Sequence, residues 1–170
     1  MAKKVLVAYA TKAGATTEVA EEVGKVLTAN GLTVEVRPVN KVKSLHACDA
    51  VVIGTAIRME KPLSEAVNFA KKFHAELASR PLACFSLGVW MREDTPEHRE
   101  MTRCFLKPLL DELPEPASLG LFGGKLDYST VSPIWRVLAS QDKTGLMQEG
   151  DWRNWEAIRA WASELAPKLS

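Results

Sequence analysis

Apolar residues along this chain form short continuous runs separated by longer stretches with helical spacing. Runs of strand length occupy residues 5–10, 50–54, 82–88 and 118–123, and residues 32–39 alternate between apolar and polar. Such runs predict five strands, with 32–39 half covered and near an edge of the sheet.

The stretches between these runs carry apolar residues three or four positions apart, which predicts helices. We expect four of them: after the Gly14 turn, from near Pro62, from the cap and first helical residue Thr95–Pro96, and from a cap at Asp151. Strands that alternate with helices are typical of a parallel sheet covered on both faces. The predicted fold class is therefore α/β, a three-layer sandwich around a five-stranded parallel sheet.

Residues 125–150 do not fit this alternation. Connections in α/β units usually span about 2–6 residues, so this segment is predicted to be an insertion with a function of its own. Within it, Ser132–Pro133 has the pattern of a helix start, followed by a short apolar group around Ile134 and Trp135. We expect one domain over residues 1–170, with the insertion at about 125–150.

Composition excludes several classes of protein to which this chain could belong. The chain has 170 residues of which 46% are hydrophobic, and no apolar run is long enough to span a membrane. Its 22 basic and 21 acidic residues are well mixed, which argues against nucleic acid as a partner. The near-neutral charge also argues against a small acidic electron shuttle.

The cysteines and the N-terminus indicate the cellular compartment in which the protein is expected. Cys48, Cys84 and Cys104 are odd in number and scattered, so no disulfide framework or metal site is predicted, and we read them as small buried apolar residues. The start of the chain lacks a signal-peptide pattern. We expect a cytoplasmic protein with at most peripheral membrane contact.

The strongest ligand signal follows the first strand. In open parallel sheets, ligands bind beyond the carboxyl ends of strands, which here are followed by 11–17, 55–61 and 88–94. The first segment opens a helix, so its backbone amides converge on one point, and Thr11 and Thr16 add hydroxyl donors. This arrangement predicts a phosphate site; an ordinary turn capped by threonine is the alternative.

Other phosphate-binding folds do not match. The chain has neither the G-x-x-x-x-G-K-[ST] spacing of P-loop proteins nor the G-x-G-x-x-G spacing of dinucleotide folds. A phospho-accepting receiver domain needs acidic residues where this chain has Thr11 and Thr55.

The T-x-x-G-x-T spacing within residues 9–16 resembles the phosphate loop of the flavodoxin family. The chain is most similar to the bacterial menaquinone-dependent protoporphyrinogen IX dehydrogenases of that family, through residues 8–16, 51–58 and 122–128 and the helix 151–161. The resemblance implies the strand order 2-1-3-4-5 and a non-covalent FMN. Its phosphate would lie on residues 11–16 and its ring between the other two loops.

The resemblance also implies the site residues. The expected FMN-binding residues are Thr11, Lys12, Ala13, Gly14, Ala15, Thr16, Thr55, Ala56, Ile57, Arg58, Gly88, Val89 and Trp90. Trp90 would stack on the flavin ring or else shield a strand end. No catalytic residue is assigned because flavin carries the redox chemistry; Arg58, beside a reduced flavin, is the one candidate, and a solvated surface arginine is its alternative.

The segment 55–61 contains no glycine, although flavodoxins often flip a peptide there during one-electron chemistry. This departure favours two-electron chemistry. The favoured function is an FMN-dependent oxidoreductase, an enzyme resembling protoporphyrinogen IX dehydrogenase, which passes electrons from a reduced substrate such as a porphyrinogen through FMN to a quinone. The alternatives are an electron-transfer flavodoxin that serves a redox partner protein, and a flavin-free interaction domain.

Overall fold

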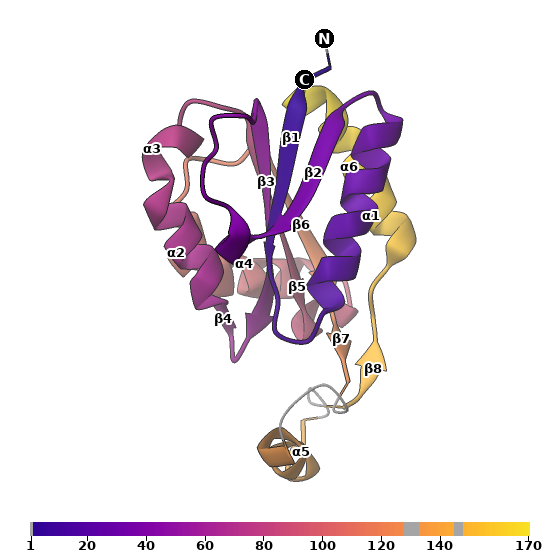
Figure 1. Ribbon diagram of the computed structural model, residues 1–170. Helices are drawn as coiled ribbons and strands as arrows, with labels where there is room; N and C mark the ends of the chain where they lie inside the picture. The colour runs from indigo at the N-terminus through magenta and orange to yellow at the C-terminus, as the bar shows by residue number, and fades with distance from the viewer. Residues whose placement is uncertain (1, 128–132, 145–147) are drawn as a thin grey trace.

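The computed structural model describes residues 2–127, 133–144 and 148–170. A parallel sheet runs through its centre, in the order β2–β1–β3–β5–β6 (Figure 1). The strands are β1 (Lys4–Ala10), β2 (Thr33–Pro38), β3 (Ala50–Arg58), β5 (Leu82–Gly88) and β6 (Ser118–Gly123). When only these five long strands are numbered, their order is 2-1-3-4-5. The predicted fold class is therefore confirmed.

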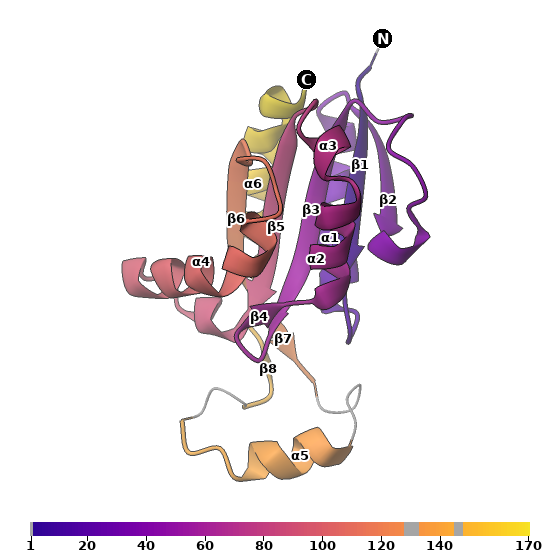
Figure 2. The same ribbon diagram turned by 90° about the vertical axis from the view of Figure 1, so that its left-hand side faces the viewer.

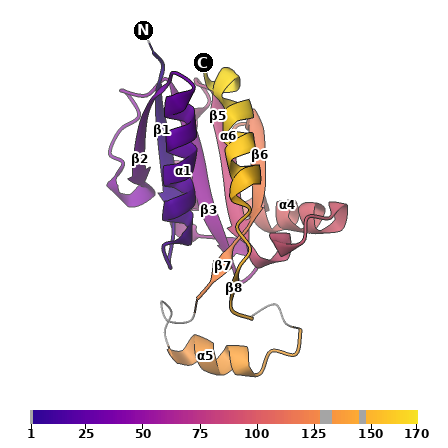
Figure 3. The ribbon, with the colours of Figure 1, turned by 90° about the vertical axis from the view of Figure 1, so that its right-hand side faces the viewer.

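Helices cover both faces of the sheet (Figures 2 and 3). One face carries α1 (Ala15–Ala29) and α6 (Trp155–Leu169), and the other carries α2 (Ser64–Lys72), α3 (His74–Leu77) and α4 (Pro96–Leu110). Side chains alternate between the two cores: Val52 packs towards α1 and α6, whereas Val51 and Ile53 pack towards α2 and α4. Burial on both faces explains why the central strands are continuously apolar.

Three very short strands lie at the carboxyl end of the sheet. β4 (Lys61–Pro62) pairs antiparallel with the end of β3, and β7 (Lys125–Leu126) pairs antiparallel with β8 (Gly150–Asp151). Two-residue strands have no hydrophobic period, so no pattern in the sequence predicted them. They lie at the end of the molecule opposite both chain termini (Figure 1).

The predicted insertion begins and ends at this β7–β8 pair. Its helix α5 (Pro133–Ser140) stands apart from the layers of the sandwich (Figures 2 and 3). Pro133 is the first residue of α5 as predicted, whereas Ser132 lies outside the described residues. Among the described residues, no helix has the length and apolarity needed to cross a membrane.

One predicted helix start lay two residues early, and another named the wrong cap. Helix α2 begins at Ser64, because Pro62 belongs to the hairpin strand β4. Helix α6 is capped by Asn154, whose side-chain oxygen accepts a hydrogen bond of 3.0 Å from the Ala157 amide. Asp151 cannot serve as this cap because it lies in β8, where its carboxylate binds Arg153. Thr95 does cap α4, accepting from the His98 amide at 3.1 Å.

Only one cysteine fits the expectation of a small buried residue. Cys84 is fully buried in β5, and burial raises the pKa of its thiol to about 12. Cys48 is half-buried and Cys104 is exposed on α4. Helical periodicity places Cys104 on the outer face, which the isolated residue type did not reveal.

Candidate cofactor site

A pocket lies at the carboxyl end of the sheet, where four segments of the chain meet. It is lined by the loop after β1, the ends of β3 and β5, and β7. The predicted residues that it brings together are Thr11, Lys12, Ala13, Ala15, Thr16, Ala56, Ile57, Arg58, Gly88 and Val89. The structure thus places most of the predicted FMN-binding residues in one pocket.

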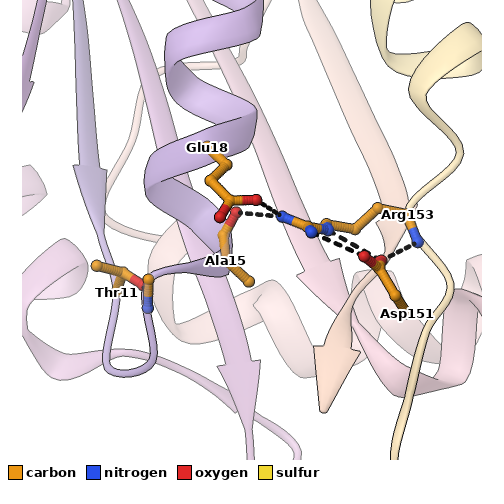
Figure 4. A network of polar contacts seen from close by, with 6 residues as sticks. Thr11, Ala15, Glu18, Asp151 and Arg153 are labelled. Carbon is orange, nitrogen blue, oxygen red and sulfur yellow. Dashed lines mark hydrogen bonds and ion pairs between the residues drawn. The ribbon is translucent and has the colours of Figure 1, made fainter. Parts of the chain in front are cut away.

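The loop after β1 is held in shape by its own residues. The amide of Gly14 donates a hydrogen bond of 3.0 Å to the Thr11 hydroxyl oxygen, which closes the loop (Figure 4 shows Thr11 and the start of α1). Gly14 has a φ of +88°, in the left-handed region that side chains with a Cβ disfavour. Gly14 therefore shapes the pocket from just outside its lining.

The first turn of α1 has unpaired hydrogen-bonding groups. In the described chain no side chain caps this helix, and its first backbone bond runs from the Glu18 amide to the Gly14 carbonyl at 3.4 Å. The preceding amides, of residues 15–17, are those that a helix cannot satisfy internally. The Thr16 hydroxyl is also buried and has no partner among the described residues. These donors, together with the helix dipole, suit an anion.

The opposite wall comes from residues that the prediction omitted. Leu87, Gly124, Lys125 and Leu126 line the pocket beside the predicted residues. The Gly124 amide donates to the Gly88 carbonyl at 3.2 Å, and a Cβ at Gly124 would lie 3.4 Å from the Gly88 nitrogen. The resemblance over residues 122–128 was the signal that could have identified this wall; Tyr128 itself lies outside the described residues.

Two predicted site residues lie elsewhere. The Thr55 side chain is fully buried; its hydroxyl donates to the Ala56 carbonyl at 2.9 Å and accepts from the Leu63 amide at 3.2 Å. Thr55 therefore joins β3 to the segment before α2. The ring of Trp90 packs on α4, with its centroid 5.9 Å from that of His98 and 6.2 Å from that of Phe105. The structure does not bring Trp90 into the pocket.

The segment 55–61 forms a tight hairpin. Arg58 pairs with Lys61, and the two residues between them, Met59 and Glu60, have φ values of +51° and +61°. Two positive φ values are the mark of a type I′ turn, which favours asparagine and glycine. Neither is present, so the sequence carried no turn signal here.

The comparison with protein families decides the family of the chain. A model of the flavodoxin domain matches residues 6–139. The chain belongs to the flavodoxin domain family. It is 26% identical over 174 residues to the protoporphyrinogen IX dehydrogenase [quinone] of Escherichia coli (strain K12), covering 96% of this chain and 94% of that protein.

Solved flavodoxins share the fold. A cysteine-to-serine mutant of flavodoxin from Pseudomonas aeruginosa has a TM-score of 0.59 at 20% identity, with 98% of each chain covered. The flavodoxin of Streptococcus pneumonia TIGR4 has a TM-score of 0.60 at 16% identity, with 98% of this chain and 99% of that chain covered. At these identities the similarity extends to the fold alone.

FMN is the cofactor to which the flavodoxin family points, and the residues present fit it. The uncapped start of α1 and the unpaired Thr16 hydroxyl offer donors that suit its phosphate. The Gly88–Gly124 contact keeps side chains out of the part of the pocket between the strand ends.

The charges around the pocket favour an anionic ligand. Lys12, Arg58 and Lys125 are among the described lining residues, and none of these lining residues is acidic. Lys12 also forms an ion pair with Glu65, and this hydrogen bond holds the pKa of the Glu65 carboxyl below its usual value. The described lining residues therefore carry a net positive charge, which Glu65 offsets in part at Lys12, although the chain as a whole is nearly neutral.

Proposed function

We propose that this protein is an FMN-dependent oxidoreductase similar to protoporphyrinogen IX dehydrogenase, passing electrons from a reduced organic substrate through FMN to a quinone. The observation that carries the proposal is the wall built by Gly124, Lys125 and Leu126, at the base of the insertion. A minimal five-stranded carrier would not need this insertion, and here it begins inside the pocket. The similarity to the Escherichia coli enzyme over nearly the whole chain supports the same reading.

In this proposal the two sides of the pocket have different tasks. The Thr16 hydroxyl, the amides of residues 15–17 and the loop closed by Thr11 hold the phosphate. Residues 56–58 and 88–89 flank the ring, and Arg58 places positive charge beside it. FMN, when bound, supplies the redox chemistry. The protein residues bind it, orient it and keep one face accessible.

The insertion is proposed to form the wall of the substrate site. Helix α5 exposes three apolar side chains, Ile134, Val137 and Leu138, which are 66%, 58% and 48% accessible. Exposed apolar groups that lie together commonly mark a surface for an apolar ligand, a partner or a membrane. A quinone and a porphyrinogen both present large apolar surfaces. Our proposal includes a cytoplasmic location, with peripheral membrane contact at most.

Deletion of the insertion tests this function. Residues 130–148 would be replaced by a short Gly-Ser bridge, which leaves Lys125, Leu126 and the paired residues of β8 in place. FMN affinity, measured by quenching of flavin fluorescence, should stay within about twofold of the full chain, because the phosphate end is untouched. Turnover of protoporphyrinogen with a quinone as the electron acceptor should be lost. Unchanged turnover would contradict the proposed role of the insertion, and loss of folding would show that the segment is structural.

A point variant gives a milder version of the same test. Replacing Leu138 with serine should raise the KM for the quinone without changing FMN affinity, because the side chain is exposed and remote from the phosphate loop. Met101→Ser on α4 is the matched control, since Met101 is also an exposed apolar residue, at 36% accessibility. Equal effects of both variants would argue against a specific surface on α5.

An electron-transfer flavodoxin is the second candidate, because the chain belongs to the flavodoxin domain family, whose fold also includes electron carriers that are not enzymes. Anaerobic photoreduction followed by absorbance separates the two. The proposed dehydrogenase should pass from oxidised to fully reduced flavin in one two-electron phase, whereas a carrier should show two separate one-electron phases. A colourless protein that does not take up FMN would instead support a flavin-free interaction domain.

A further inference from the structure

Arg153 joins two parts of the pocket that are far apart in the sequence. It lies in the link between β8 and α6, and its side chain is only 4% exposed. Its guanidinium donates to the Glu18 carboxylate at 2.6 Å and to the Ala15 carbonyl at 3.4 Å, both in the first turn of α1 (Figure 4). The guanidinium therefore lies against the first turn of α1, whose amides belong to the proposed phosphate site.

Asp151 and Trp155 fix the orientation of this side chain. The Nε and one terminal nitrogen of Arg153 donate to the two Asp151 carboxylate oxygens at 2.9 and 2.8 Å, in the two-pronged geometry typical of strong arginine pairs. The Trp155 ring centroid lies 4.8 Å from the guanidinium carbon. Hydrogen bonding to Arg153 holds the pKa of the Asp151 carboxyl below its usual value.

The position of Glu18 gives this contact an electrostatic consequence. A helix N-terminus carries roughly half a positive elementary charge, which attracts a phosphate. Glu18 is in that first turn and would contribute a full negative charge. Unpaired, its carboxylate would offset the attraction of the helix for a phosphate dianion. Arg153 contacts both Glu18 and Asp151, so these three side chains carry one net negative charge instead of two, and most of the attraction is kept.

We propose that Arg153 is a positioning residue which, by lowering the negative charge beside the first turn of α1 and holding that turn in place, makes the pocket selective for the phosphorylated flavin. This inference rests on the proposed FMN site. The same residue links the opposite wall, because its partner Asp151 pairs in register with Lys125 of the pocket lining.

Binding of FMN and riboflavin to the apoprotein tests the proposal, because only FMN carries the phosphate. Arg153→Gln should raise the Kd for FMN by about three- to tenfold, since Glu18 is 56% exposed and partly screened by solvent. The Kd for riboflavin should change less than about twofold. Adding Glu18→Gln should restore most of the FMN affinity, and Arg153→Lys, which keeps the charge, should retain the preference for FMN.

Arg159 provides a matched control. It forms an equivalent contact from α6 to α1, donating to Glu22 at 2.8 Å one helical turn further from the phosphate loop. Arg159→Gln should leave the ratio of the two Kd values unchanged. Equal weakening of both flavins by Arg153→Gln, the same loss of preference in Arg159→Gln, or no rescue by Glu18→Gln would overturn the proposal.

The single variants Glu18→Gln and Arg153→Lys keep the test decisive if Arg153→Gln does not fold. Glu18→Gln alone should not weaken FMN binding. Loss of the preference for FMN over riboflavin in Arg153→Lys would contradict the charge argument. A wild-type protein that binds FMN no better than riboflavin would refute the proposed phosphate site itself. A wild-type preference for FMN that persists in Arg153→Gln would refute only the role of Arg153.

Discussion

The two ends of the pocket are built in different ways. The proposed phosphate end is a single stretch, residues 11–16, whose shape depends on one loop hydrogen bond and one left-handed glycine. The other end is assembled from Ala56–Arg58, Gly88–Val89 and Gly124–Leu126, which sheet pairing and the β7–β8 hairpin bring together. The loop at the first end is therefore shaped mainly by neighbouring residues, whereas the other end depends on the whole fold.

The two ends of the pocket also differ in whether their buried hydroxyl groups have hydrogen-bond partners. At the phosphate end the Thr16 hydroxyl is buried without a partner among the described residues, a cost that a bound anion would remove. At the other end the buried Thr55 hydroxyl is fully used between Ala56 and Leu63, and conformational cost resides in the backbone of Met59 and Glu60. The following variants change one end at a time.

The largest effect is expected for Gly14→Val. The left-handed region costs a residue with a Cβ about 1–2 kcal/mol, and relaxation of the loop would also displace its amides. The FMN Kd should rise on the order of a hundredfold, and the riboflavin Kd far less. Gly31→Val is the control, because Gly31 has a φ of +90° at the other end of α1. Gly31→Val should lower the melting temperature similarly without changing the Kd for FMN. A comparable rise in that Kd would mean that general destabilisation explains both variants.

Thr16→Val should give the next largest effect, with opposite signs for stability and binding. Removing a buried, unpaired hydroxyl should leave the apoprotein as stable or more stable in urea. The FMN Kd should rise on the order of tenfold, because a hydrogen bond to the charged phosphate is lost. Ser86→Ala is matched to it, since the Ser86 hydroxyl is also buried and unpaired among the described residues. Ser86→Ala should not change FMN affinity; if Thr16→Val leaves it unchanged too, the phosphate does not contact this hydroxyl.

At the other end, Glu60→Gly should stabilise the protein by about 1 kcal/mol, because glycine adopts positive φ without a steric cost. Thermal unfolding followed by circular dichroism measures the gain. Glu60→Ala, which keeps the Cβ, should show no such gain. FMN affinity should be unchanged in both variants, and a loss of FMN in Glu60→Gly would show that the rigid turn contributes to binding.

The smallest effect concerns acid stability at the Arg153 contact. The folded-state pKa of Asp151 is lowered, mainly by its hydrogen bond from Arg153. Its contribution to stability is therefore fully present above the unfolded pKa of about 3.9 and is lost as the pH falls through the folded value. Because the Asp151 side chain is 41% exposed, Asp151→Asn should cost only a few tenths of a kcal/mol at pH 7.

Urea unfolding at pH 7 and at pH 2 measures this difference. The two proteins should differ at pH 7, and the difference should shrink towards pH 2 as protonation of the carboxyl removes the charge interaction. A difference that is equally large at both pH values would mean that Asp151 acts through packing rather than charge.

Local signals explain what could be predicted. The apolar runs on β1, β3 and β5 identified the buried strands, and the Thr95–Pro96 pair identified the start of α4, because each signal lies within one element. Contacts between distant residues explain the errors. Asp151 has the residue type of a helix cap, but Arg153 and the pairing with β7 place it in a strand. Trp90 follows β5 as expected, yet its ring packs against α4.

By itself, the sequence determined the α/β sandwich and a loop that lines the pocket, since hydrophobic period and a contiguous T-x-x-G-x-T motif are properties of neighbouring residues, and the resemblance to the flavodoxin family implied the strand order. Only the tertiary structure decided that Gly124–Leu126 close the pocket and that Arg153 reaches Glu18, 135 positions away in the chain. Sheet register and the β7–β8 hairpin fix these contacts, and no local pattern encodes the distance between two segments once the chain is folded.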